Sequence, residues 1–347
     1  MAKPLVGIDI GNDSIRAVEL ADPSAGTPQV TRYGQIGLPP GAAASGEVLE
    51  PLVVAAALRQ LWTDVGFKTR NVVLGMGNQR VLVRDLVVPR MTIEQIRESL
   101  PFQVQEMLPV PVDEAILDFY PVAEVAGDGP PQVSGLLVAA VKENVLANIR
   151  AVEEAGLTAV AVDLIPFALV RAQLRGQNLR GTVALIDVGA TTTNVVIVTD
   201  GVPNFVRIIP AGGEEVTKAL SARLEIAPEI AERAKRQVGI SVAGIAEEHR
   251  PIAEIASEVS GQLLNGIRNT IHYFVVARNN TPVDRIVLSG GGARLPGFGK
   301  ALAEFTQLPA TTVDPFGGVS MAKPTGKGPA ASPAMAVALG LALGAAA

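Results

Sequence analysis

Cysteine is absent from this 347-residue sequence, which excludes disulfide bonds and metal sites built from thiolates. Aromatic residues make up only 4% of the chain, so the core must be built from Ala, Val, Leu and Ile. The net charge of −5 and the lack of a basic cluster argue against nucleic acid as a partner. No stretch reaches the roughly 18–20 apolar residues of a membrane-spanning helix, and the N-terminus lacks a signal-peptide pattern. We therefore expect a cytoplasmic protein.

The composition predicts a well-buried globular protein with two domains. Apolar residues make up 48% of a chain that is long enough for two domains of ordinary size. Predicted strands and helices alternate in both halves, which favours α/β layers built twice. We expect a first domain over 1–178 with a small α+β insert at about 89–138, and a second domain over 179–347. The last helix, at 333–347, could pack back onto the first domain.

Local signals predict the ends of several elements. A helical pattern over Glu47–Val65 ends at Gly66, a typical C-terminal cap. In the insert, Thr92 and Gln95 resemble a capping box, and Pro101 is expected to kink the following helix or split it in two. Two predicted loops are rich in glycine and proline, at 126–132 and 315–332.

One pattern occurs twice in the chain. It reads LVGIDIGNDSIRAVEL near the N-terminus and ALIDVGATTTNVVIVTD in the second half. Each copy predicts an apolar strand that ends near an aspartate, a turn at a glycine two residues later, and a second strand. Asp9 with Gly11 and Asp187 with Gly189 have the same spacing, so the chain is predicted to contain two equivalent hairpins.

The hairpins are typical of a phosphate site. A glycine just after a strand-terminal aspartate lets backbone amides turn toward a ligand, and such amides bind phosphate oxygens. Two facing carboxylates also suit Mg²⁺, which keeps several water and phosphate ligands. We therefore predict that the hairpins face each other around phosphate, with Asp9 and Asp187 at the metal. Each hairpin alone could equally be an ordinary turn, but their repetition favours phosphate.

A third motif follows a predicted buried strand late in the chain. Gly290, Gly291 and Gly292 are consecutive, and three glycines permit an adenine or ribose to approach the backbone closely. A flexible turn is the alternative. The motif does not match the G-x-G-x-x-G fingerprint of dinucleotide-binding proteins, and the chain contains no Walker A motif.

The order of hairpin, second hairpin and strand–GGG turn resembles the superfamily of actin, Hsp70 and sugar kinases. Within it, the chain resembles the PilM family of type IV pilus assembly proteins, which is related to the division proteins of the FtsA family. Three stretches carry this resemblance: GIDIGNDSIRAVEL, VPRMTIEQIRESLPFQVQEMLPVPVDEAILDF and VDLIPFALVRA. It implies an actin-like (ribonuclease-H-like) duplicated fold, with two α/β domains around a cleft that binds ATP and Mg²⁺.

The resemblance also implies roles for individual residues. Asp9 and Asp187 would lie near Mg²⁺, through water. The residues assigned to the phosphates are Gly11, Asn12, Asp13, Ser14, Arg16, Gly189, Ala190, Thr191 and Thr192. The residues assigned to the ribose and adenine end are Gly213, Glu232, Lys235, Gly290, Gly291, Gly292 and Arg294.

Some of these roles have plain alternatives. Arg16, where relatives usually carry Lys, could be an outward strand residue in water. Glu232 and Lys235 are three residues apart on a predicted helix, so they could form a surface ion pair. The one catalytic candidate is Asp163, which could equally cap the helix near Pro166. The sequence therefore indicates a nucleotide-binding protein that is at most a slow ATPase.

In function, the resemblance implies a cytoplasmic ATP-binding protein of the type IV pilus assembly machinery. Its partner would be the cytoplasmic tail of a PilN-like inner-membrane protein, and such machinery proteins would hold it at the inner face of the membrane. Two alternatives stay open. A small-molecule kinase would need sugar-contacting residues that are not evident early in the chain. An FtsA-like division protein would end in a basic amphipathic helix, whereas this sequence ends in ALGLALGAAA.

Overall fold

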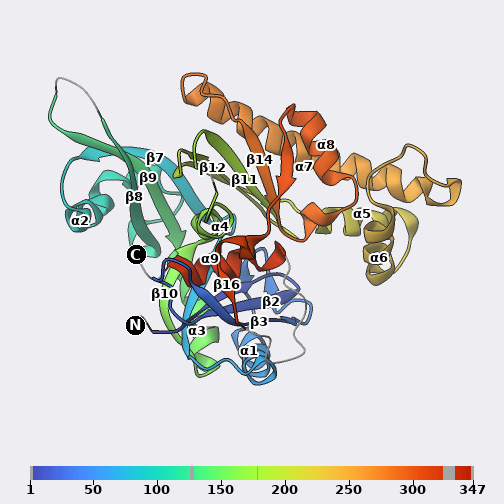
Figure 1. Ribbon diagram of the computed structural model, residues 1–347, viewed down its shortest axis with the longest axis horizontal. Helices are drawn as coiled ribbons and strands as arrows, with labels where there is room; N and C mark the ends of the chain where they lie inside the picture. The colour runs from blue at the N-terminus through green and yellow to red at the C-terminus, as the bar shows by residue number, and fades with distance from the viewer. Residues whose placement is uncertain (1–2, 126–128, 178, 323–332, 345–347) are drawn as a thin grey trace.

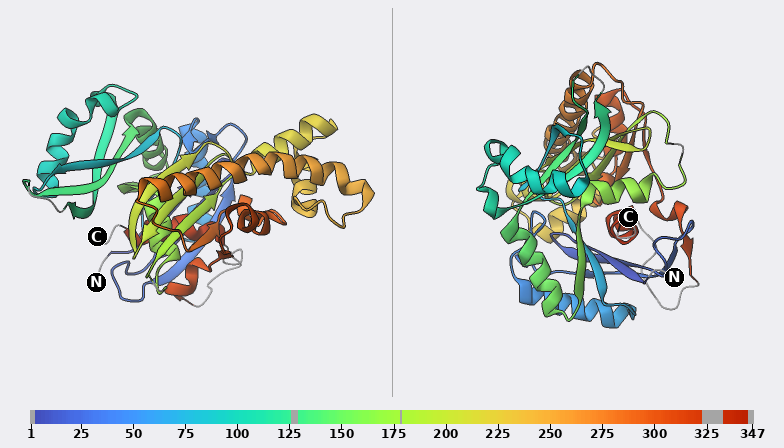
Figure 2. Two further views of the ribbon diagram at one scale, coloured as in Figure 1. Left: turned by 90° about the horizontal axis from the view of Figure 1, so that it is seen from above. Right: turned by 90° about the vertical axis from the view of Figure 1, so that its left-hand side faces the viewer.

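Two larger β-sheets covered by helices form the body of the protein, and a smaller sheet projects from it (Figures 1 and 2). The structure is a computed structural model that describes residues 3–125, 129–177, 179–322 and 333–344. Parts of the two predicted glycine- and proline-rich loops, the predicted domain end at 178 and the last three residues of the predicted terminal helix lie outside these ranges. Among the described helices, none has the length and hydrophobicity needed to cross a bilayer.

The first sheet carries the first hairpin. Its strands are β1 (Leu5–Ile10), β2 (Ser14–Leu20), β3 (Gln29–Gly37), β6 (Asn71–Met76), β10 (Thr158–Leu164) and β16 (Ser320–Met321). The strand order is β10-β6-β1-β2-β3-β16, with β1 antiparallel to β2 and parallel to β6. Helices pack on both of its faces: α1 (Pro51–Val65) and α3 (Lys142–Glu154) on one, α4 (Ile165–Gln173) and α9 (Ala336–Gly344) on the other.

The second sheet carries the second hairpin. Its strands are β11 (Thr182–Val188), β12 (Thr193–Thr199), β13 (Val202–Ile209), β14 (Arg285–Ser289) and β15 (Ala310–Thr312), in the order β13-β12-β11-β14-β15. The helices of this half are α5 (Glu214–Leu224), α6 (Pro228–Val238), α7 (Arg250–Ala277) and α8 (Phe298–Thr306). Residues of all four helices pack with the sheet in one apolar core.

The projecting part is a three-stranded sheet with one helix on it. Its strands are β7 (Val81–Pro89), β8 (Ala115–Val125) and β9 (Gln132–Val141), and its helix is α2 (Ile93–Gln103). The capping box of Thr92 and Gln95 is confirmed. Of the two effects expected at Pro101, a kink or a split, the split does not occur, because α2 continues to Gln103 and the Val104 amide still donates to Leu100. Proline lies in the last turn, where its missing N–H removes little of the helix.

Two other local predictions need correction. The helix predicted over 47–65 begins at Pro51, because Glu47–Val48 forms β5, which pairs with β4 (Ala43–Ala44). Its predicted end is confirmed, since Gly66 caps it with φ 72°. The predicted loop after Pro315 contains β16. Short 3₁₀ turns lie in the connections: η1 (Gln105–Met107), η2 (Val112–Glu114), η3 (Glu247–His249), η4 (Gly292–Arg294), η5 (Pro315–Gly318) and η6 (Pro333–Met335).

Helices α4 and α9 lie where the two sheets meet (Figure 1). A side chain at Gly340 of α9 would collide with the backbone of Ala168 on α4, and one at Gly7 of β1 would collide with Ala338 of α9. Glycine at these two positions therefore lets the helices and β1 pack backbone against backbone. Because α4 also contacts β11 and β12, it brings the two hairpins to the same region of the molecule.

Candidate functional site

The two repeated motifs fold into the same local structure. β1 with β2, and β11 with β12, form antiparallel hairpins. In each turn the glycine amide donates to a carbonyl three residues later, from Gly11 to Ser14 and from Gly189 to Thr192, both at 2.9 Å. Thr191 and Thr192 stay partly exposed at the second turn. The predicted duplication is therefore confirmed down to its turn hydrogen bonds.

Asp9 and Asp187 come together near the ends of their strands. Each is only 9% exposed, and they are close enough for their charges to interact. Asp9 Oδ2 accepts from Arg16 Nη1 at 3.3 Å, and Asp187 Oδ1 accepts from Ser289 Oγ at 2.7 Å. The two carboxylates predicted at the metal thus lie in the same region, each with one polar side-chain partner.

Burial dominates the electrostatics of this pair. It raises the pKa of Asp9 above its ordinary value, against the lowering effect of the Arg16 guanidinium. It also raises the pKa of Asp187 to about 6, an effect that the Ser289 hydrogen bond opposes and the charge of Asp9 strengthens. A divalent cation would favour the ionised form of both groups. The described residues contain no cluster of three or more potential metal ligands, so such an ion would need water and phosphate ligands, which Mg²⁺ accepts.

Arg16 offers a donor at the same place. Its side chain is 18% exposed, and its buried Nε has no hydrogen-bond partner within the described part of the chain. A buried donor without a partner costs free energy, and a phosphate oxygen would satisfy it. Arg16 therefore differs from an outward strand residue in water and fits an anion beside the carboxylates.

Other side chains of the first turn are engaged within the protein. Ser14 Oγ donates to Asp13 Oδ1 at 2.9 Å. Asn12 Nδ2 donates to Glu214 Oε2 at 2.9 Å, and Asn12 Oδ1 accepts from the Ser45 amide at 3.3 Å. Because Asn12 and Ser14 already have protein partners, phosphate contacts at this turn would come mainly from backbone amides.

The glycine pair before α5 packs on the second hairpin turn. The Gly213 amide donates to Gly189 O at 3.0 Å, and the Glu214 amide donates to Ala190 O at 2.8 Å. A side chain at Gly212 would collide with the same two carbonyls. These contacts fix the start of α5 against the predicted phosphate loop.

The three consecutive glycines follow β14 and differ in their surroundings. Gly290 has φ +87°, and a side chain there would collide with the backbone of Val188. A side chain at Gly292 would crowd Val188 as well, whereas one at Gly291 would meet nothing within 4 Å. Packing explains the outer two glycines. The middle one leaves open space beside the backbone, as a bound ligand would need.

The predicted pair on α6 reaches this region. Lys235 is 8% exposed, and its Nζ donates to Gly213 O at 3.0 Å and to Thr217 Oγ1 at 2.9 Å. Glu232 pairs with Lys235 at 2.5 Å. Partial burial raises the pKa of Glu232, but hydrogen bonds from Lys235, Thr217 and Arg236 outweigh it and hold the pKa at about 2. Lys235 is therefore a buried anchor beside Gly213 rather than half of an exposed ion pair.

One predicted residue lies apart from this group. Asp163 pairs with Arg171 on α4 and accepts from the Leu164 amide at 2.7 Å. Arg171 also donates to Gly340 O at 3.0 Å, so this ion pair holds α9 against α4. The structure does not bring Asp163 to the two central carboxylates. Arg294 is exposed on the turn after the glycines.

Two polar residues that the motifs did not indicate complete the site. Ser289 is the partner of Asp187. Asn194 lies opposite Asp187 in the β11–β12 register and is 3% exposed, with an Oδ1 that lacks a partner among the described residues. This oxygen lies next to Gly77 of the first half. The repeat did contain the signal, because its constant offset aligns Asn194 with Arg16.

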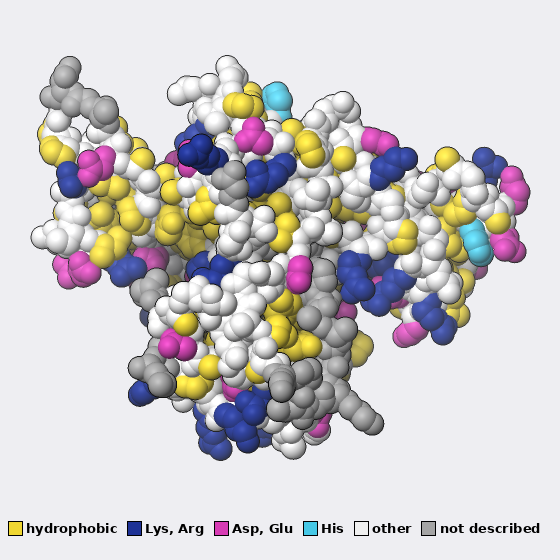
Figure 3. Space-filling model, in the orientation of Figure 1, with side chains coloured by type: hydrophobic (Ala, Val, Ile, Leu, Met, Phe, Trp, Pro, Cys, Tyr) yellow, Lys and Arg dark blue, Asp and Glu magenta, His cyan; other side chains and the backbone are white. Residues whose placement is uncertain are grey.

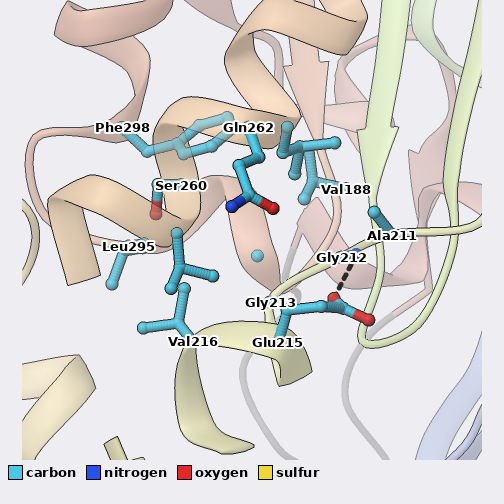
Figure 4. Close-up of a pocket in the computed structure, with 13 residues that line it drawn as sticks. Val188, Ala211, Gly212, Gly213, Glu215, Val216, Ser260, Gln262, Leu295 and Phe298 are labelled. Carbon is cyan, nitrogen blue, oxygen red and sulfur yellow. Dashed lines mark hydrogen bonds between the residues drawn. The ribbon is translucent and has the colours of Figure 1, made fainter. Parts of the chain in front are cut away.

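A small cavity lies behind the glycine loops (Figure 4). Its volume is about 50 Å³, and it lies between the backbone of Gly212, Gly213 and Gly292 and the side chain of Gln262 on α7. This space holds a few water molecules but no nucleotide base.

A protein-family model covers nearly all of this chain. A family model described as type IV pilus assembly protein PilM matches residues 7–346. The cell division protein FtsA of Bacillus subtilis (strain 168) is 27% identical over 258 residues, which are 67% of this chain and 58% of that protein. FtsA of Streptococcus pneumoniae serotype 2 is 29% identical over 44% of this chain and 37% of that protein. The chain thus matches less than two thirds of the length of these curated relatives.

Solved structures show the same fold along the whole chain. The PilM-PilN type IV pilus biogenesis complex has a TM-score of 0.85 and 26% identity, and covers 99% of this chain and 98% of its own. Ethanolamine utilization protein EutJ from Carboxydothermus hydrogenoformans has a TM-score of 0.59 at 18% identity, over 99% and 90%. MreB5 of Spiroplasma citri bound to ADP has a TM-score of 0.51 at 13% identity, over 98% and 95%. The predicted actin-like fold is confirmed.

Proposed function

Because the chain belongs to the type IV pilus assembly protein PilM family, we propose that it is an ATP-binding, actin-like protein of the type IV pilus assembly machinery. The proposed partner is the cytoplasmic tail of a PilN-like inner-membrane protein, which would hold the protein at the inner face of the membrane. The observation that carries this proposal is the similarity to the PilM-PilN complex along nearly the entire chain.

The proposed nucleotide lies between the two hairpins. The Gly11 and Gly189 amides already donate within their turns, so the following amides of each turn would bind the phosphates, and Arg16 would satisfy its free Nε there. The adenosine end would lie along Gly291. When bound, Mg²⁺ would neutralise phosphate charge and hold the two central aspartates in their ionised form. Among the described residues we identify no side chain that would act as the general base for an attacking water, so we propose slow ATP hydrolysis at most.

We further propose that the projecting sheet forms one side of the groove for the partner tail. Hydrophobic side chains gather where this sheet meets the body (Figure 3). Large hydrophobic residues stay exposed on it, namely Val87, Phe102, Ile116 and Val125. An exposed apolar surface of this kind is typical of a contact with a partner.

The projecting sheet is also tied to the second half. Arg278, at the end of α7, pairs with Asp85 on β7 at 2.5 Å and donates to Asn204 O at 2.9 Å. Closure of the two halves around a nucleotide would therefore shift this sheet relative to the first sheet. We propose that bound ATP changes the affinity for the tail in this way.

A titration tests the partner and the coupling together. A peptide with the sequence of a PilN-like cytoplasmic tail from the same organism is titrated into the protein with and without ATP and Mg²⁺, with a scrambled peptide as control. We expect specific binding whose affinity depends on ATP, and a loss of affinity in Phe102→Ser. Phe305→Ser, which alters an exposed residue of α8, is the matched control. Equal affinity with and without ATP would refute the coupling, and no binding at all would refute the partner.

The similarity to FtsA supports one second candidate, a division protein that forms polymers on membranes. ATP-dependent filaments on lipid vesicles, together with no affinity for the pilus tail, would favour it. A kinase of the same fold would instead consume ATP rapidly with one member of a panel of sugars and short acids.

A further inference from the structure

A single hydrogen bond links the first hairpin turn directly to the start of α5. Asn12 Nδ2 donates to Glu214 Oε2 at 2.9 Å, although 202 residues separate them in the sequence. Asn12 lies in the turn between β1 and β2 of the first sheet, and Glu214 is the first residue of a helix of the second half (Figure 1). The bond therefore spans the two halves at their proposed phosphate loops.

Both ends of this bond are braced. On the first half, Asn12 Oδ1 accepts from the Ser45 amide at 3.3 Å. On the second half, Glu214 Oε1 pairs with Lys218 Nζ at 3.1 Å, and the Glu214 amide donates to Ala190 O at 2.8 Å. Because each residue is fixed within its own half, the bond between them holds the halves at a set separation.

The contact bridges the two turns between which the nucleotide would lie. The Glu214 carboxylate is bonded to Asn12 in the first turn, and the Glu214 amide is bonded to Ala190 in the second turn. A nucleotide that enters or leaves between the turns requires them to separate, so the hydrogen bond must break each time.

We propose that the contact between Asn12 and Glu214 is a latch that controls the rate of nucleotide exchange. The inference rests on the proposed nucleotide site. The latch opens to let the nucleotide pass and re-forms when the halves close, so it acts on the barrier in both directions. Its loss should raise the association and dissociation rate constants by a similar factor, about tenfold for a hydrogen bond to a charged group, and leave Kd nearly unchanged.

Stopped-flow kinetics with a fluorescent ATP analogue and Mg²⁺ test the latch. We expect both rate constants to rise about tenfold in Glu214→Ala. In Glu214→Gln, which keeps an acceptor for Asn12, they should lie between those of the wild type and Glu214→Ala. Glu229→Ala removes an exposed carboxylate from the first turn of α6 and should match the wild type. Thermal unfolding of each variant shows that it is folded.

The outcomes separate the latch from the nucleotide site. Absence of analogue binding to the wild type would overturn the proposed nucleotide site itself. Binding with unchanged rate constants in Glu214→Ala would overturn only the latch. An increase in the dissociation rate constant alone would also overturn it, because Glu214 would then be a direct ligand of the nucleotide.

A cross-link provides an independent measurement. The chain contains no cysteine, so Asn12→Cys and Glu214→Cys create the only two thiols available to a short bis-maleimide. We expect the cross-linked protein to exchange nucleotide at least tenfold more slowly than the same variant before cross-linking. Exchange at an unchanged rate would overturn the latch.

Discussion

The substitution Asp187→Asn should stabilise the protein without nucleotide while it weakens nucleotide binding. Burial raises the pKa of Asp187 from 3.8 to about 6, so ionisation in the fold costs ~3 kcal/mol at pH 8. Asn is a neutral group of the same shape, and its Oδ1 can still accept from Ser289. Because the pKa is higher in the folded than in the unfolded chain, the stability that Asp187 contributes is greatest below pH 3.8 and is lost as the pH rises through about 6.

Urea unfolding in the presence of EDTA measures this effect. The free energy of unfolding of Asp187→Asn should exceed that of the wild type by ~3 kcal/mol at pH 8, and the difference should fall below about 1 kcal/mol at pH 4. Addition of Mg²⁺ and an ATP analogue should stabilise the wild type and leave the variant nearly unchanged. A variant that is less stable than the wild type at pH 8, or a difference that does not depend on pH, would refute the reasoning.

Three further predictions concern neighbouring residues. Gly290→Ala should lower the free energy of unfolding by at least about 2 kcal/mol, because φ +87° and the Val188 backbone leave no room for a side chain. Gly291→Ala should keep its free energy of unfolding and lose nucleotide affinity, because only open space surrounds that position. Urea unfolding and equilibrium binding measure the two effects. Asn194→Leu should leave the free energy of unfolding within about 1 kcal/mol, since it removes an amide whose oxygen has no partner within the described chain, and a loss above 2 kcal/mol would contradict this. The pKa of Glu232 is held near 2, below its ordinary 4.5, so the stability it contributes is present above pH 4.5 and lost as the pH falls toward 2; the stability gap between the wild type and Glu232→Gln should close over that range in acid unfolding.

The hairpins could be predicted because their signals are local. Asp9 and Gly11 lie within one strand and its turn, and the repeat at Asp187 added information that one copy lacks. The capping box at Thr92 is local as well, and it was also confirmed. By contrast, the start of α1 was misplaced, since pairing of Glu47–Val48 with β4 decides it.

What the sequence could not provide are contacts between distant segments. The Oδ1 of Asn194 lies next to Gly77 of the other half, and the buried Nζ of Lys235 donates to the carbonyl of Gly213. Neither neighbour is close in the sequence. Asp163 was a candidate by position, but its pairing with Arg171 appears only when α4 folds back over β10. Burial and charge pairing across the chain, rather than residue type, decide these roles.

Calorimetric titration of a non-hydrolysable ATP analogue with and without Mg²⁺ tests the central claim, that the two hairpins hold a nucleotide and its cation. The wild type should bind in a Mg²⁺-dependent manner, and the double variant Asp9→Asn with Asp187→Asn should remain folded and lose that dependence. A wild type that does not bind, or a double variant that binds with the same affinity and the same response to Mg²⁺, would contradict the account.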